Sequence, residues 1–373
     1  RDFCLSRGLG DVYKRQNLLR KHYMSKKYKI VITVVCCVVL AILLTTMAVS
    51  TYANSDADNA EPVEALADWM SMISSSTKVK DIVIPGAHDA GTQGMPWFAE
   101  TQDKSVEDLL LCGTRYFDLR VEKKGDNLVI YHGISTGVAL TDVLDTFRSF
   151  LTKHNSETLL LDFQHFKGEG AQEAVAQLLE STLASNFAVK NSSSSTTDKD
   201  YISQLTLHNA RGKCIIFWGS DSNSALDKQY IFKRNDDLGN RTNSSLHSFY
   251  NAQWNRQSSE YYISNAIPQY IKMYRDKGYG LFVLQGQLTD GLYIRGPKLR
   301  ERTHNENMNK YLVSLIGSED LQYINIVMRD YAGCTKNCYA LQLNLAKGNL
   351  ISSMQEKYVE MLENYITVTA DEI

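Results

Sequence analysis

The chain has 373 residues, 43% hydrophobic and 22% charged, an ordinary globular composition that fits one large barrel-type domain or two medium ones. Its 40 basic and 42 acidic residues are unevenly distributed, because 9 basic and 2 acidic residues precede position 54 and leave a net charge of −9 on the remainder. That acidic balance argues against nucleic acid as a partner and against docking on anionic lipid by charge alone.

The first 53 residues carry a targeting pattern instead of fold information. Because the first methionine is Met24, we interpret residues 1–23 as a leader from upstream of the true start. Three lysines then precede an uncharged run over residues 30–49, and small residues follow, which is the layout of a signal peptide over residues 24–53. Since about 20 apolar residues also span a bilayer, an uncleaved membrane anchor is the alternative. In both cases we expect the domain to be exported, either secreted or tethered to the outer face of the membrane.

After a small, acidic linker at residues 54–64, apolar strands alternate with helices, which predicts βαβ units and a parallel sheet. No glycine-rich dinucleotide fingerprint is present, and about seven such units favour a single TIM-like (β/α) barrel over residues 65–373, closed or nearly closed. The predicted strands are 81–84, 116–121, 128–131, 158–163, 213–218, 281–284 and 324–328, and the predicted helices are 105–112, 140–154, 171–183, 263–274 and 354–365.

Four of the seven cysteines lie in the exported part. Cys112 and Cys214 sit in apolar surroundings and are interpreted as buried thiols. Cys334 and Cys338 are candidates for a small disulfide loop, because an exported protein meets an oxidising compartment. Two cysteines are too few for a zinc site, so we expect no metal there.

Charged residues recur where the predicted strands end. In IPGAHDAGT, Ile84–Thr92, the Pro-Gly turn is followed at once by His88 and Asp89. On the second strand Asp118 and Arg120 are two positions apart and share a face, opposite the apolar residues. Since unpaired buried charge is costly, both side chains must enter a polar site or pair with each other.

Two later strands place further ionisable residues at the same rim. His132 follows the third predicted strand, and Asp330 follows the last one. Functional side chains of a parallel barrel project from the carboxyl ends of its strands, so we expect these groups to converge. Two histidines can supply a general base and a general acid, and an arginine can stabilise a phosphate oxygen. The pattern predicts phosphodiester cleavage without a metal or other cofactor.

Several segments resemble the phosphatidylinositol-specific phospholipases C of the X-domain family, in particular the bacterial, metal-independent type. They are IPGAHDAGT, GTRYFDLRV (Gly113–Val121), IYHG (Ile130–Gly133), ETLLLDFQHF (Glu157–Phe166), GLFVLQGQLTDG (Gly280–Gly291) and NIVMRDYAG (Asn325–Gly333).

The resemblance implies a role for each matching position. His88 would be the general base toward the inositol 2-hydroxyl, and His132 the general acid toward the diacylglycerol oxygen. Arg120 stands where calcium-dependent members carry an aspartate ligand. The carboxylates of Asp89, Asp118 and Asp330 would orient the acid, the arginine and the base. The implied products are diacylglycerol and an inositol 1,2-cyclic phosphate.

The resemblance is incomplete in the substrate pocket. Gln164 stands where bacterial members have lysine, and Trp218 stands where a substrate-binding arginine is expected. Trp97 and Phe98, on the loop after the first strand, either anchor the protein at a membrane or pack on the barrel rim.

The sequence thus predicts an exported, monomeric enzyme that acts on a phospholipid at a membrane surface. A glycerophosphodiester phosphodiesterase is disfavoured, because that family wants a metal-binding Glu-x-Asp set and this chain has Asp118-x-Arg120. A catalytically silent headgroup-binding module is the remaining alternative.

Overall fold

The computed structural model describes residues 26, 28–42, 58–190, 197–219, 228–235, 239, 244–289 and 296–368. Contacts divide the chain into two compact units, Arg1–Ser55 and Asp56–Ile373. In the first unit residues 28–42 are helical, so the predicted apolar run is described only as far as position 42. The leader and the positions around the expected cleavage site lie outside the described residues. Among the helices that are described, none is both long and apolar enough to cross a bilayer.

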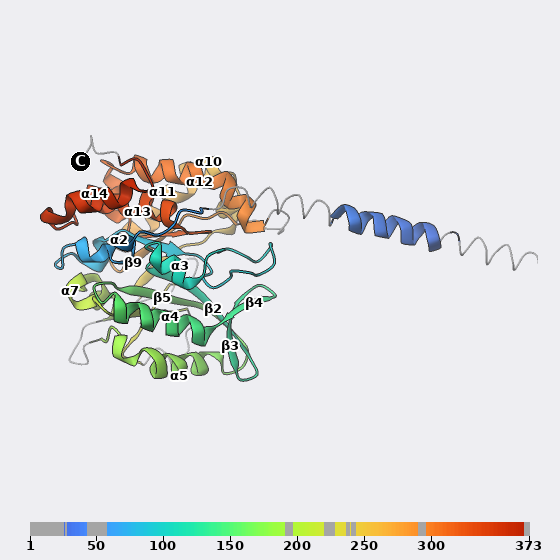
Figure 1. Ribbon diagram of the computed structural model, residues 1–373, viewed down its shortest axis with the longest axis horizontal. Coiled ribbons are helices and arrows are strands. Elements are labelled where there is room, and N and C mark those ends of the chain that lie inside the picture. The colour runs from blue at the N-terminus through green and yellow to red at the C-terminus, as the bar shows by residue number, and fades with distance from the viewer. Residues whose placement is uncertain are drawn as a thin grey trace, which may run out of the picture. The chain divides into compact units, whose positions relative to one another are not determined.

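The second unit is a nearly closed barrel of eight parallel strands (Figure 1). Its strand order is β7-β6-β5-β2-β1-β10-β9-β8. The strands are β1 (Ile84–Ala87), β2 (Tyr116–Lys124), β5 (Leu159–Lys167), β6 (Cys214–Trp218), β7 (Ile231–Lys233), β8 (Leu246–Ser248), β9 (Leu281–Gln285) and β10 (Ile326–Arg329). The TIM-like architecture predicted from the alternation of strands and helices is confirmed.

The two edge strands, β7 and β8, meet through a short parallel bridge between Arg234 and Leu246. The N–H of Ser245 donates to the carbonyl of Lys233 at 2.7 Å, and the N–H of Asn235 donates to Leu246 at 2.9 Å. These bonds satisfy the edge groups that an open sheet would expose.

Helices surround the strands and complete two apolar layers. Alternation along β2 sends Tyr116 into the barrel interior cluster and Phe117 and Leu119 into a cluster with the helices. The helices are α2 (Glu64–Ala67), α3 (Val106–Leu111), α4 (Leu140–Lys153), α5 (Ala171–Leu183), α6 (Asp198–Gln204), α7 (Leu207–Ala210), α9 (Ala252–Asn255), α10 (Ser259–Tyr261), α11 (Ile267–Arg275), α12 (Gly296–Ser314), α13 (Cys334–Ala346) and α14 (Gln355–Glu363).

The first strand differs from its prediction. It begins at Ile84, where the prediction ended it, and Pro85 and Gly86 lie within it. A side chain at Gly86 would bring its Cβ to 2.8 Å from the ring of Tyr116, so this glycine allows β1 and β2 to approach closely. The carbonyl of Pro85 accepts the N–H of Arg115 at 3.0 Å. The Pro-Gly pair is therefore part of the strand and not its end.

The third predicted strand is not a barrel strand. β3 (Asn127–His132) pairs antiparallel with the outer part of β2, and β4 (Ser135–Ala139) pairs antiparallel with β3. The turn at Gly125, with φ of 62°, reverses the chain directly after β2. A period of two is common to parallel and antiparallel strands, so the sequence did not distinguish them.

The predicted disulfide between Cys334 and Cys338 is wrong. Cys112, which follows α3, is bonded to Cys334, the first residue of α13, with a Cα–Cα distance of 4.4 Å. Cys338 lies one helical turn farther on as a buried thiol, and Cys214 is a buried thiol as predicted. The bonded residues are 222 positions apart, so local spacing gave no sign of the pairing.

Candidate active site

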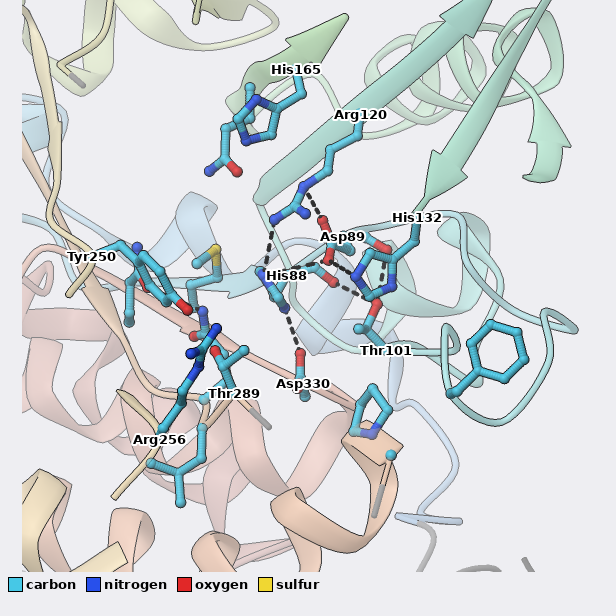
Figure 2. Close-up of a pocket in the computed structure, with 18 residues that line it drawn as sticks. His88, Asp89, Thr101, Arg120, His132, His165, Tyr250, Arg256, Thr289 and Asp330 are labelled. Atoms are coloured by element: carbon cyan, nitrogen blue, oxygen red, sulfur yellow. Dashed lines mark hydrogen bonds and ion pairs between the residues drawn. The ribbon is translucent and has the colours of Figure 1, made fainter. Parts of the chain in front are cut away.

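The carboxyl ends of β1, β2 and β10 open into a cavity of about 270 Å³ (Figure 2). His88 and Asp89 follow β1, and Asp330 follows β10. Arg120 lies on β2, and His132 ends β3. All five line the cavity, so the convergence predicted from the strand ends is present in the fold.

His88 is held in one orientation. Its Nδ1 lies 2.7 Å from Oδ1 of Asp330, and Nδ1–H donates in this geometry because the carboxylate can only accept. Its Nε2 lies 3.3 Å from Nη2 of Arg120. Since the guanidinium can only donate, this contact fits an imidazole with an unprotonated Nε2. The side chain of Gln102, itself fully buried, donates to the carbonyl of His88 at 2.8 Å and fixes the backbone. The buried pair His88–Asp330 thus directs an accepting nitrogen into the cavity.

Three carboxylates control the charge of His88. Burial alone would lower the pKa of His88, but the charges of Asp89, Asp330 and Asp118 outweigh burial and raise this pKa to about 9. The contact between Arg120 and Nε2 therefore belongs to the neutral form of His88, which becomes the main form only as the pH rises past this pKa.

Asp89 is the central anion. It is buried and its backbone has a φ of 45°, a left-handed conformation that is uncommon outside glycine. Arg120 forms an ion pair with it through Nε. Burial would raise the pKa of Asp89, but the charges of Arg120 and of His88 lower it to about 2. Asp89 therefore stays ionised across the working pH range and holds the guanidinium in place.

Asp118 lies behind Asp89. Its Oδ2 accepts the backbone N–H of Asp89 at 3.4 Å and lies 3.7 Å from Nη2 of Arg120. Complete burial raises the pKa of Asp118 to about 6 despite the opposing charge of Arg120. Asp118 supports the strained turn of Asp89 and the arginine, and it does not line the cavity.

His132 faces the cavity from the other side of Asp89. Its Nδ1 donates to the carbonyl of Ala99 at 2.8 Å, and its Nε2 lies 3.5 Å from Oδ2 of Asp89. The backbone contact fixes the ring so that Nε2 points into the cavity. His132 reached this rim from an antiparallel hairpin, although the prediction put it at the end of a barrel strand.

One feature of the cluster also suits a metal ion. Single ligand atoms of His88, Asp89 and Asp118 lie within 4.8 Å of one another. However, Arg120 contacts both carboxylates, so its guanidinium already supplies the positive charge that a divalent cation would bring. A cation would have to compete with an arginine that is held by two buried carboxylates.

A β-bulge on β5 brings two side chains to the cavity. Leu119 pairs with Phe163 and Arg120 pairs with His165, so Gln164 is the extra residue between them. Gln164 and His165 both line the cavity. Gln164 therefore lines the cavity, and its contact with substrate stays a prediction.

Trp218 does not reach the cavity. It is fully buried at the end of β6, and its ring lies 4.3 Å from that of Phe166 and 5.6 Å from that of Phe163. Its indole N–H donates to Gln172 of α5 at 3.1 Å. The expectation that Trp218 lines the substrate pocket is corrected, because the side chain points away from the interior toward the helices.

The sequence missed a group of residues on the opposite wall. Arg256, Tyr250 and Thr289 lie across His88 from Asp89 and His132 (Figure 2). They come from the segments after β8 and β9, which carry no strand-end charge pattern, so only their position after barrel strands was a signal. Within the part of the chain that the structure describes, the exposed Arg256 side chain has no hydrogen bond or ion pair.

The loop after β1 shapes the cavity entrance. Phe98 lines the cavity. Trp97 is 37% exposed, and its ring packs edge-on against the ring of Phe98. Part of the Trp97 ring also covers Gly296, where a Cβ would come within 2.8 Å. The Trp97 ring is thus packed on one side and open to solvent on the other, and its contact with a membrane stays a prediction.

Part of this chain is similar in sequence to known proteins. Residues 79–219 match the family model of phosphatidylinositol-specific phospholipase C, X domain. A 1-phosphatidylinositol phosphodiesterase of Listeria monocytogenes is 37% identical over 101 residues, which cover 25% of this chain and 31% of that protein. The human PI-PLC X domain-containing protein 2 is 31% identical over 134 residues, covering 27% of this chain and 44% of that protein. The match thus spans less than half the length of each of these relatives.

Solved structures show the same fold at lower identity. The phosphatidylinositol-specific phospholipase C from Listeria monocytogenes superposes with a TM-score of 0.59 and 21% identity, covering 75% of this chain and 98% of that chain. A structure of the Staphylococcus aureus enzyme superposes with a TM-score of 0.57, 16% identity and coverage of 74% and 97%.

Proposed function

We propose that the chain cleaves phosphatidylinositol or a related inositol phospholipid, because residues 79–219 match the family model of phosphatidylinositol-specific phospholipase C, X domain. The products would be diacylglycerol and an inositol 1,2-cyclic phosphate. One observation carries the proposal: His88 and His132 flank the Asp89–Arg120 ion pair, with one imidazole nitrogen of each directed into a single cavity. A headgroup-binding module would have no need of a base and an acid in this arrangement.

The residues divide the reaction between them. Nε2 of His88 takes the proton of the inositol 2-hydroxyl as its oxygen attacks phosphorus, and Asp330 stabilises the imidazolium that forms. Arg120 donates to a non-bridging phosphate oxygen as negative charge increases there. Nε2 of His132 then donates a proton to the glycerol oxygen as its bond to phosphorus breaks. One proton enters the protein and one leaves it, so the cyclic phosphate retains its single negative charge.

We propose that this reaction needs no metal ion, because the positive charge at the phosphate comes from Arg120. Asp89 and Asp118 fix the guanidinium from two sides, which orients it before substrate binds. A calcium-dependent site would instead offer its carboxylates to the cation.

The opposite wall would hold the headgroup. We propose that Arg256 of this wall and Gln164 of the β5 bulge donate hydrogen bonds to the ring hydroxyls, since both line the cavity. A guanidinium presents a planar fork of donors, which suits neighbouring hydroxyl oxygens as well as a phosphate. Phosphatidylinositol and its glycosylated forms share this ring.

We further propose that the enzyme works outside the cytoplasm as a monomer, at a membrane surface that Trp97 and Phe98 contact. The apolar run over residues 30–49 supports export, either as part of a signal peptide or as an anchor. A disulfide between Cys112 and Cys334 is consistent with an oxidising compartment.

The test is turnover of phosphatidylinositol in excess EDTA, with phosphorus NMR to detect the cyclic phosphate. Full activity in EDTA supports the proposal, whereas activity that calcium alone restores would refute the role of Arg120. Release of phosphatidic acid and free inositol, instead of diacylglycerol and the cyclic phosphate, would indicate the glycerophosphodiesterase alternative. Binding of vesicles without turnover, unchanged in His88→Ala, would indicate a silent binding module.

A further inference from the structure

Gln102, on the loop between β1 and α3, is fully buried and does not line the cavity. Its Nε2 donates to the carbonyl of His88 at 2.8 Å and to the carbonyl of Arg329 at 2.9 Å. Its Oε1 accepts the N–H of Ala332 at 2.9 Å. These partners fix the orientation of the amide, since only its NH₂ group can donate and only its oxygen can accept. Gln102 therefore joins the end of β1 to the residues on both sides of Asp330.

The backbone directly after Asp330 is strained. Tyr331 has a φ of 46°, a left-handed conformation that costs free energy in a bulky residue and persists only where its surroundings enforce it. The N–H of Tyr331 donates to the carbonyl of Thr101 at 2.7 Å, and its hydroxyl donates to the carbonyl of Glu100. Residues 100–102 thus hold the strained turn that carries Asp330, and Gln102 links this turn to His88.

A buried bridging amide can be purely structural, as Asn325 at the amino end of β10 shows. Asn325 is also fully buried, its NH₂ group donates to two backbone carbonyls, and its oxygen accepts one backbone N–H, at 2.7–3.3 Å. Gln102 differs from Asn325 in the side chains that its partners carry. It fixes the backbones of His88 and of the Asp330 turn, whose side chains meet at 2.7 Å (Figure 2).

The contact between His88 and Asp330 depends on the relative position of two strand ends, because each residue follows a different strand. We propose that Gln102 is a positioning residue that holds the Asp330 carboxylate against Nδ1 of His88. If the proposed function holds, on which this inference rests, Gln102 supports the general base without touching the substrate.

Several charged groups face the His88 imidazole. They are Asp89 after β1, Asp118 and Arg120 on β2, Asp330 after β10, and Arg256 across the cavity. Gln102 joins only Asp330 to His88 through hydrogen bonds to both strand ends. Loss of Gln102 should therefore weaken one of the three carboxylate contacts that raise the pKa of His88, and this pKa should fall.

The experiment compares Gln102→Met with the control Asn325→Leu in the full-length chain. Each substitution replaces a buried amide by an apolar side chain of similar size and removes three hydrogen bonds to the backbone. On monomeric short-chain phosphatidylinositol, Gln102→Met should lower kcat about 10–100-fold, because a displacement of about 1 Å at a catalytic group has an effect of this size. The ascending limb of kcat/KM should move to lower pH. Asn325→Leu should lower the stability comparably but keep kcat within about twofold and leave the pH profile in place.

A double-mutant cycle separates positioning from general loosening of the fold. If Gln102 acts through Asp330, Gln102→Met should lower kcat by no more than about twofold further in the Asp330→Asn background. Losses that multiply, an unchanged kcat and pH profile in Gln102→Met, or the same changes in Asn325→Leu would each overturn the inference. If Gln102→Met does not fold, Gln102→Asn takes its place in the cycle, because the shorter amide cannot reach both strand ends at once.

A titration that needs no turnover separates this inference from the proposed function. NMR of the histidine imidazoles gives the pKa of His88, whose signal is assigned by its loss in His88→Ala. We expect a lower pKa of His88 in Gln102→Met than in the wild type, and an unchanged one in Asn325→Leu. A wild-type chain that cleaves no phosphatidylinositol refutes the proposed function, whereas an unchanged pKa of His88 in Gln102→Met refutes the positioning role.

Discussion

Replacing Asp330 by asparagine tests the assignment of the base most directly. The carboxylate lies 2.7 Å from Nδ1 of His88 and is 3% exposed, so the pair is shielded from water. Asparagine has the same shape but can turn its NH₂ group toward Nδ1, which would place the imidazole proton on Nε2. His88 would then face the substrate with a donor where an acceptor is required.

The Asp330→Asn substitution should have two separable effects, one on kcat and one on the pH profile. Loss of the correct tautomer removes general-base catalysis, so kcat on monomeric phosphatidylinositol should fall about 10²–10⁴-fold. Loss of the negative charge should also lower the pKa of His88, since Asp330 is one of three carboxylates that raise it to about 9. A base works in its deprotonated form, so the ascending limb of kcat/KM, expected near pH 9 in the wild type, should move to lower pH in the variant.

The assay is kcat/KM between pH 5 and 10 for the wild type, Asp330→Asn and the control Asp103→Asn. Asp103 also pairs with a cation, Lys298 at 3.2 Å, but it lies outside the cavity and should leave the profile unchanged. The reasoning is refuted if Asp330→Asn keeps kcat within about twofold of the wild type. It is also refuted if the ascending limb moves to higher pH, because the variant would then have strengthened the proton's hold on His88.

Further substitutions test the remaining roles. His132→Ala should lose about 10²–10⁴-fold in kcat on phosphatidylinositol. The variant should retain most activity on a nitrophenyl ester of inositol phosphate, because that leaving group needs no acid. Equal losses on both substrates would exclude His132 as the acid. Arg120→Ala should lower kcat about 10²–10³-fold in the presence or absence of EDTA, and recovery on adding calcium would show that a metal can replace the guanidinium. Arg256→Ala should raise KM about tenfold with little change in kcat, with partial recovery in Arg256→Lys, whereas a fall in kcat alone would contradict a headgroup contact. Dithiothreitol should lower the free energy of unfolding by about 2–4 kcal/mol by reducing the Cys112–Cys334 bond, as measured by denaturant titration, and should not affect a chain with serine at both positions.

Much of the candidate site was predictable from local pattern and one rule of barrel geometry. Asp118 and Arg120 share a face because strands have a period of two, and charged residues on a buried strand must find partners. His88 and Asp330 follow strands whose carboxyl ends meet at one rim. These inferences needed only the order of strands, and the structure brings the residues together.

Residues supplied by irregular segments could not be predicted in this way. Arg256 lies after the three-residue β8, which is too short for a periodic signal. α12 is predominantly polar, and α13 is buried on most sides, so neither helix shows the apolar stripe that identified α4.

The sequence by itself determined the barrel and the candidate site residues, because the barrel follows from strands that alternate with helices and the site residues lie on those strands or at their ends. Only the tertiary structure decided which groups touch. The antiparallel pairing of β3 with β2 sets the position of His132, and the bulge at Gln164 brings His165 to the cavity. Cys112 meets Cys334 across 222 residues. Such contacts depend on the register and closure of the whole sheet, which no local pattern of residues encodes.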